Sequence, residues 1–343
     1  MLSFGVTFAD VSITGSINQT YSSWKDNGVV ANIGTVNAVG DRNTATGDSY
    51  LTFSGSEDLG DGIKASFKVE PRLNISGADS TTSGLGKSAA NEFGTFSSIF
   101  GANREAWIGL SGAFGNVRLG NNYTPLFLRS VAAYDVNGSA NAPGYLVSNI
   151  TTFSATNSID YIAPKFVDGL GIQLNKNTGR SGSLVAKDTT AGDSVGWGIS
   201  YNAGALSIGI AGETTKNTKL DDYVNTVANA SITENLKKTG YGASYNFGVA
   251  KVSINGLKST LGSSYVDSFG YGLSVPFGAV TLNASSSSLK DKGSVNYEHS
   301  AYQAGLNYAF SKRTSAYLLI NNVKNTTKNT ALTINSLGVV HNF

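Results

Sequence analysis

The chain is built from segments of about ten residues in which apolar side chains alternate with polar or small ones. Between Ile63 and Glu70, for example, every odd position is apolar and every even position is polar or charged. Successive side chains of a β-strand point to opposite faces, so each segment has one apolar and one polar face. The segments recur with no helical pattern between them. This favours an all-β fold that presents one face to lipid and the other to water.

The alternation predicts about 16 strands, and the connections between them alternate in length. Short connections carry tight-turn residues, as in 58–62 and 112–115, and long polar stretches such as 74–101 and 123–155 separate them. A transmembrane antiparallel β-barrel has this rhythm, with short periplasmic turns and long external loops. A soluble β-helix or propeller would repeat a motif at a fixed period, and the sequence contains none. The expected strands span 10–22, 48–57, 62–73, 102–111, 115–122, 156–164, 169–177, 194–203, 205–213, 238–247, 249–259, 265–275, 278–288, 299–310, 313–323 and 333–343.

Composition agrees with a barrel and excludes several other classes. The 343 residues are 40% hydrophobic with no run that approaches 18 apolar residues, so a transmembrane helix is excluded. There are no cysteines, which removes disulfides, thiolate nucleophiles and Cys-based zinc sites. The net charge of +2 comes from scattered basic residues, and no nucleic-acid partner is expected.

Five stretches, spread in order over nearly the whole chain, carry a family pattern. They are 51–65 (LTFSGSEDLGDGIKA), 104–120 with its Arg-Glu-Ala-Trp start, 157–164, and the closing 308–314 and 338–343. These stretches resemble the general diffusion porins of Gram-negative outer membranes, particularly the betaproteobacterial type. The resemblance implies one barrel domain over 1–343, with a third loop, about 121–155, folded into the lumen. It also implies a passive channel for small hydrophilic solutes and ions.

The same resemblance implies a set of partners and a location. We expect a homotrimer in the outer membrane of a Gram-negative bacterium, in contact with membrane lipid and lipopolysaccharide. In this family the terminal aromatic is part of the signal read by the barrel-assembly machinery, a role that falls here to Phe343. Residues 1–9 end in Thr-Phe-Ala and are interpreted as mature protein or as a signal remnant.

A barrel of 16 strands is too wide for side chains to fill, and ion selectivity then depends on the charges that line its narrowest part. Periodicity places several cations on the polar face with Glu70, and Arg104 joins them if Trp107 faces lipid. The third loop offers two further charges to the facing side. The candidate pore-lining residues are Lys64, Lys68, Arg72, Arg104, Arg118, Arg129 and Asp135.

The sequence departs from the family where relatives tend to carry arginines on the second, fifth and sixth strands. Those positions hold Tyr50, Asn121 and Thr156, and only Arg104 and Arg118 match residue by residue. The arginine set is therefore thinned, and we expect a weak anion preference. Each charge could instead be an ordinary solvated residue of the lumen.

Enzyme motifs are poor, and neither a cofactor nor a metal is expected. Residues 192–196 match G-x-S-x-G but lead into a predicted strand, whereas that motif needs a strand–turn–helix elbow. Residues 86–88 lack the first glycine of a phosphate loop, and 135–138 lack most ligands of a calcium loop. Two alternatives stay open: a channel specific for a sugar or an organic acid, and a barrel that serves as an enzyme or adhesin.

Overall fold

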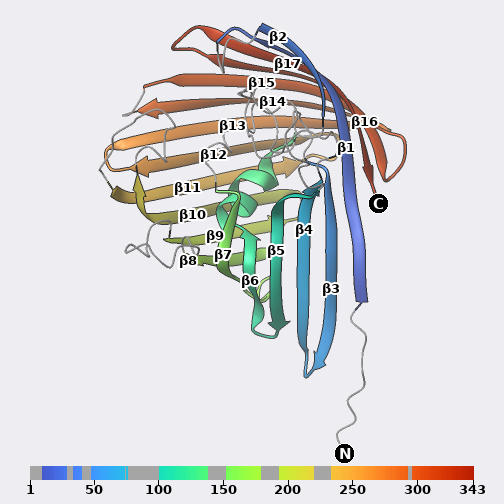
Figure 1. Ribbon diagram of the computed structural model, residues 1–343, viewed down its shortest axis with the longest axis vertical. Coiled ribbons are helices and arrows are strands. Elements are labelled where there is room, and N and C mark those ends of the chain that lie inside the picture. Colours follow the sequence, from blue (N-terminus) through green and yellow to red (C-terminus); the bar gives the residue numbers. More distant parts are fainter. Residues whose placement is uncertain are drawn as a thin grey trace, which may run out of the picture.

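The computed structural model describes residues 10–28, 34–40, 48–73, 75, 100–137, 152–178, 193–219, 233–292 and 296–343. In these ranges the chain forms a single antiparallel sheet with two short helical turns between β6 and β7 (Figure 1). The strands are β1 Asp10–Asp26, β2 Gly34–Gly40, β3 Tyr50–Gly60, β4 Ile63–Leu73, β5 Phe100–Gly112, β6 Gly115–Tyr123, β7 Ser154–Ile162, β8 Leu170–Thr178, β9 Asp193–Ala203, β10 Leu206–Lys219, β11 Thr233–Asn246, β12 Lys251–Leu261, β13 Ser264–Phe277, β14 Val280–Lys292, β15 Glu298–Ala309, β16 Thr314–Asn325 and β17 Thr330–Asn342. The helical turns are η2 Phe127–Val131 and η3 Ala132–Tyr134.

The sheet closes on itself through β1. On one side β1 pairs with β17, from Ser16 opposite Asn342 to Asp26 opposite Leu332. On its other side the first half of β1 pairs with β3 and the second half with β2. The described sheet has 17 strands, and β2 and β3 share one place beside β1, so the barrel has 16 places around its wall. The predicted all-β antiparallel barrel of about 16 strands is confirmed.

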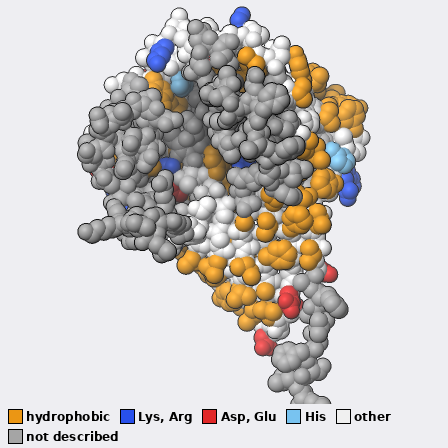
Figure 2. Space-filling model, in the orientation of Figure 1, with side chains coloured by type: hydrophobic (Ala, Val, Ile, Leu, Met, Phe, Trp, Pro, Cys, Tyr) orange, Lys and Arg blue, Asp and Glu red, His pale blue; other side chains and the backbone are white. Residues whose placement is uncertain are grey.

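The two faces of the wall differ as the alternation predicts. On β9 the side chains of Val195, Ile199 and Tyr201 are exposed, while Ser194 and Ser200, on the opposite face, are buried. The exposed apolar residues lie on the outside of the barrel, where they form a belt over the strands (Figure 2). The inner face is dominated by Ser, Thr, Asn, Gln and charged residues. An apolar exterior around a polar interior is the pattern of a barrel whose solvent is lipid outside and water inside.

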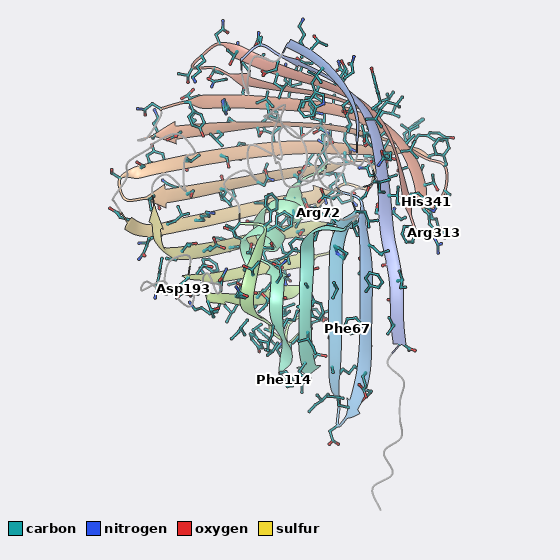
Figure 3. The ribbon with its side chains drawn as sticks, in the orientation of Figure 1. Phe67, Arg72, Phe114, Asp193, Arg313 and His341 are labelled. Atoms are coloured by element: carbon teal, nitrogen blue, oxygen red, sulfur yellow. The ribbon has the colours of Figure 1, made fainter. Side chains whose placement is uncertain are left out.

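Exposed aromatic side chains mark one rim of the belt. Phe114, Phe247, Phe277 and Phe310 lie in or beside the short turns and are all at least 46% exposed. Figure 3 shows Phe114 at the tip of the connection between β5 and β6. Aromatic rings favour the boundary between hydrocarbon and water, so this set is interpreted as one of the two girdles of a membrane barrel.

The strands are longer than predicted on the side of the long connections, and β2 was not predicted at all. β10 continues to Lys219 and β11 begins at Thr233, where the prediction stopped at 213 and began at 238. The added part of β10, Thr214 to Lys219, is polar on both faces. Above the belt both faces of a strand meet water, so backbone pairing continues while the alternation that reveals a strand disappears.

One row of the belt provides a stability test. Leu306 on β15 lies on the outer face between Leu282 and Leu318 of the neighbouring strands, whereas the next residue, Asn307, lies on the inner face. We expect Leu306→Arg to destabilise the barrel in lipid vesicles by about 2–4 kcal/mol, because the charge is forced into hydrocarbon. Asn307→Arg, with the charge in the lumen, should cost less than about 1 kcal/mol. Urea unfolding measures both, and equal losses would contradict the assigned faces.

Candidate pore constriction

The inner face of β3 to β6 carries a connected set of charges centred on Glu70. The Glu70 carboxylate accepts a hydrogen bond from Thr52 Oγ1 at 2.7 Å and lies 2.9 Å from Lys68 Nζ and 3.2 Å from Arg104 Nε. Arg104 Nε also donates to the Tyr123 hydroxyl at 2.9 Å. Glu70 is almost fully buried, and hydrogen-bonded cations on two sides compensate its charge.

Glu105 extends this set toward β6. Its Oε2 lies 2.5 Å from Lys68 Nζ, and its Oε1 accepts a hydrogen bond from Trp107 Nε1 at 3.2 Å. The guanidinium of Arg118 stacks on the Trp107 ring, 4.2 Å from its centroid, in a cation–π contact. At the other end Arg72 pairs with Asp48 at 2.5 Å. We call the whole set the charge ladder, and its members are Asp48, Lys68, Glu70, Arg72, Arg104, Glu105, Trp107 and Arg118.

A bulge in β5 determines which side chains join the ladder. The register between β4 and β5 shifts at Pro71, so that Glu70 faces Glu105 while Pro71 faces Asn103. Proline cannot donate a ladder hydrogen bond and is found in sheets at such irregularities. Because Arg104 is the extra residue, both it and Glu105 reach the inner face, where a regular strand would separate them.

Arg104 therefore lies on the inner face, as expected, but the premise from which that position was predicted is wrong. The prediction had Trp107 facing lipid, but its ring lies inside, against Arg118 and Glu105. Simple alternation from an inward Trp107 would send Arg104 outward. The bulge reverses that outcome, and Pro71 is the sequence signal that could have revealed it.

The remaining predicted cations of β4 lie at its two ends. Lys64 is exposed next to the short turn, away from the ladder. Arg72 lies at the opposite end of β4, toward the helical turns (Figure 3). The sequence pattern did not predict Asp48, Glu105 and Tyr123 as members of this site, because alternation assigns a residue to a face and does not pair it with a partner on another strand.

On the far side of the lumen the chain after β6 turns back onto the wall. Thr124 begins the turn: its Oγ1 accepts a hydrogen bond from the Phe127 N–H at 3.1 Å. Pro125 follows at the first helical position, where its missing N–H costs nothing. The turn η2 and then η3 lie against the inner face of β9 to β12, inside the arch of the sheet (Figure 1). We call residues 124–137 the inner segment.

The inner segment is seated on an apolar contact and on a track of glycines. Leu126 and Val131 form a buried cluster with Ala211 and Leu257, two apolar residues of the inner wall. Around this cluster the wall lacks side chains, because a Cβ added at any of these glycines would come within 2.0–2.8 Å of an atom of the inner segment. The glycines are Gly171, Gly198, Gly209, Gly240, Gly242 and Gly272. We call them the glycine track.

Hydrogen bonds join the start of this loop, at Thr124, to its end, at residues 152–153. The Thr124 N–H donates to the Phe153 carbonyl at 2.9 Å, and Thr124 Oγ1 donates to the Thr152 carbonyl. Thr152 in turn donates to Glu213 Oε1 at 2.6 Å and accepts from Lys238 Nζ at 2.8 Å. Residues 138–151 of the predicted loop lie outside the described residues.

The side chains of Arg129 and Asp135 lie against the wall beneath the inner segment rather than pointing across the lumen toward the charge ladder. Arg129 Nη1 donates to Ser200 Oγ at 3.0 Å on β9. Asp135 lies over β12 to β14, where Asn137 fastens the end of the segment through a hydrogen bond from its Nδ2 to Ser285 Oγ at 2.5 Å. Burial raises the pKa of Asp135, and a hydrogen bond from the Asn137 N–H partly offsets that rise.

The structure does not support the weak match to a nucleophile motif. Ser194 of the G-x-S-x-G match lies within β9, so the strand–turn–helix elbow that this motif requires is not formed there. Gly192 and residues 86–88 lie outside the described residues, as do residues 1–9. Among the described residues no helix is both long and apolar enough to span a bilayer.

A closed barrel with an apolar belt outside and a charged ladder inside defines a transmembrane channel of the outer-membrane type. Residues 2–328 match the family model described as Gram-negative porin. The chain belongs to this family. It is therefore a diffusion channel of the Gram-negative outer membrane and not an enzyme.

Individual relatives agree with this assignment. The chain is 28% identical over 326 residues to the major outer membrane protein P.IB of Neisseria meningitidis, covering 90% of this chain and 86% of that protein. It is 27% identical over 290 residues to outer membrane porin protein 32 of Delftia acidovorans, covering 78% and 72%. Among solved structures, the anion-selective porin from Comamonas acidovorans superposes with a TM-score of 0.72 at 21% identity, covering 98% of this chain and all of that one. The expected family and its betaproteobacterial type are confirmed.

The glycine track makes a direct prediction about the inner segment. A Cβ at Gly242 would lie 2.0 Å from Cδ2 of Tyr134. We expect Gly242→Ala to push Tyr134 off the wall and into the lumen, since overpacking of this kind costs about 1–3 kcal/mol. Single-channel conductance should fall.

Two variants control this experiment. Adding Tyr134→Ala should restore the conductance of Gly242→Ala, because it removes the clashing ring. Ser244→Ala, at the next inner position of β11, should leave conductance at the wild-type value. A fall that survives in the double variant would show that the alanine acts elsewhere.

Proposed function

We propose that the charge ladder and the inner segment are the two walls of the pore constriction, and that the pore has a weak anion preference. The observation that carries the proposal is the pairing within the ladder. It contains four cations, Lys68, Arg72, Arg104 and Arg118, and three carboxylates, Asp48, Glu70 and Glu105, a difference of one positive charge. A nearly balanced constriction discriminates weakly between anions and cations.

The loop that contains the inner segment completes this constriction. We infer that the whole third loop, about 121–155, folds into the lumen, supported by the seat of residues 124–137 on the glycine track and by the join between Thr124 and Thr152. The loop narrows the bore from the side opposite the ladder. Small hydrophilic solutes and ions therefore pass between fixed charges and a fixed backbone.

The assembly is proposed from the family. Porins are typically trimeric, and a homotrimer of this chain buries part of the apolar belt of each barrel while lipid and lipopolysaccharide cover the rest. The barrel-assembly machinery is the proposed partner of the final strand, β17, which ends beside Phe343.

Ion selectivity tests the constriction. We expect a small reversal potential of the anion-preferring sign in a salt gradient across a planar bilayer. Arg104→Glu changes the net charge of the ladder by two units. For a permeating ion at ~10 Å from this charge in water, with salt screening, the change alters the permeability ratio roughly two- to fourfold toward cations. Glu105→Gln removes one negative charge and should move the ratio the other way.

A charge change outside the lumen provides the matched control. Lys290 on β14 forms an exposed pair with Glu298 at 3.7 Å, on the outer face. Lys290→Glu makes the same two-unit change and should leave the reversal potential unaltered. A clear cation preference in the wild type, or an equal shift from Lys290→Glu, is incompatible with the proposal.

The proposed assembly signal can be separated from a packing role for Phe343. Its backbone exchanges two hydrogen bonds with Gly15, at 3.0 and 3.1 Å, and these do not need the ring. We expect Phe343→Ala to lower the amount of barrel inserted in cells while refolding in detergent proceeds as in wild type. Phe310→Ala removes another exposed ring and should assemble normally. If Phe343→Ala also refolds poorly in detergent, the ring has a packing role and the signal is not supported.

A further inference from the structure

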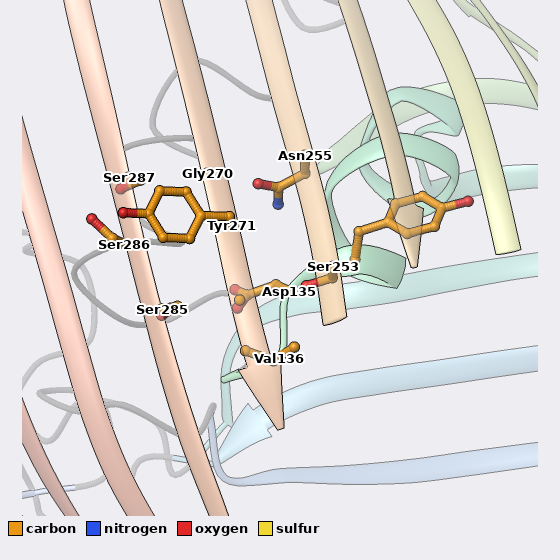
Figure 4. Close-up of a pocket in the computed structure, with 11 residues that line it drawn as sticks. Asp135, Val136, Ser253, Asn255, Gly270, Tyr271, Ser285, Ser286 and Ser287 are labelled. Carbon is orange, nitrogen blue, oxygen red and sulfur yellow. The ribbon is translucent and has the colours of Figure 1, made fainter. Parts of the chain in front are cut away.

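A small cavity lies between the inner segment and the wall formed by β12, β13 and β14. Its volume is about 10 Å³, near the smallest space that holds one water-sized particle. Its walls carry oxygen atoms from hydroxyl, amide and carboxylate side chains, and Figure 4 shows these residues arranged around Asp135. The polar side chains concerned are Asp135, Ser253, Asn255, Ser285 and Ser287.

The Asp135 carboxylate is the unusual member of this set. Its Oδ1 accepts a hydrogen bond from the Asn137 N–H at 3.0 Å. Its Oδ2 is buried and has no hydrogen-bond partner among the described residues. Within that part of the chain no Lys or Arg forms an ion pair with it. A carboxylate oxygen that is buried without a partner or a compensating charge is costly, and a proton or a bound cation at this oxygen offsets that cost.

The surroundings favour a cation. Ser253 and Asn255 lie on the inner face of β12, are at most 6% exposed, and form no side-chain hydrogen bond with another described residue. Hydroxyl, amide and carboxylate oxygens together are the ligands of hard cations. With a single carboxylate in the cavity, one positive charge is enough to balance the site.

We propose that this cavity binds one small monovalent cation, such as sodium, between Asp135 and the hydroxyl-rich wall of β12 to β14. The cation acts as a clamp. It is held by the inner segment on one side and by the barrel on the other, next to the hydrogen bond from Asn137 to Ser285. The ions that fill the pore supply it, and its occupancy stabilises the seated position of the inner segment.

Thallium(I) serves as the probe, because it is monovalent and scatters anomalously. Crystals of the wild-type protein in which sodium salts are replaced by thallium(I) acetate should show an anomalous peak in the cavity within bonding distance of Asp135 Oδ2. Asp135→Asn keeps the shape, removes the charge and should abolish the peak. Asp267→Asn, on the neighbouring strand β13, should retain it. A wild-type cavity that holds only water, or a peak that persists in Asp135→Asn, overturns the proposal.

A second measurement uses the protein in solution and does not depend on crystals. At constant ionic strength, replacing N-methyl-D-glucamine chloride by sodium chloride should raise the urea midpoint of the wild type, because sodium binds the folded form. The midpoint of Asp135→Asn should not respond to this exchange, while that of Asp267→Asn should follow the wild type. A wild-type midpoint that is indifferent to sodium means that a proton neutralises Asp135, and the clamp is then excluded. Neither experiment depends on the ion selectivity of the channel.

Discussion

The whole molecule depends on the requirement that a chain in hydrocarbon must satisfy every backbone N–H and C=O within itself. For strands the only solution is closure, and here β1 provides it by pairing along one edge with β17 and along the other with β2 and β3. Once the cylinder is closed, successive side chains of each strand point alternately outward and inward, so each residue faces either lipid or the lumen. The polar interior is therefore a consequence of backbone pairing, and the side chains that determine the chemistry of the channel lie on this inner face.

The lumen is asymmetric. One part of the wall, β3 to β6, carries charges that pair with one another: Lys68 lies between Glu70 and Glu105, and Arg104 lies against Glu70 and Tyr123. Another part, β8 to β13, carries few charges and many glycines on its inner face, and the inner segment packs against it. Paired charges therefore lie on one side of the lumen and a docked backbone segment on the other.

The strands and their faces could be predicted from sequence, because lipid and water act on alternate residues within the belt. The prediction weakened wherever that contrast was absent. β2 is only seven residues long, and the upper part of β10 is polar on both faces, so neither carries a clear periodic signal. Arg104 and Trp107 were linked by simple alternation, which the bulge opposite Pro71 breaks. The directions of Arg129 and Asp135 follow from tertiary contacts of a loop, for which no local pattern exists.

The glycine track also says something about how such channels can diversify. A loop of different sequence needs a different set of bare positions on the wall beneath it, spread over β8 to β13 and far apart in the chain. Exchanging the loop alone between two relatives would place new side chains over old ones. A chimaera is expected to fold and conduct only when the loop and the wall residues beneath it are exchanged together. The two must therefore change together, both in evolution and in engineering.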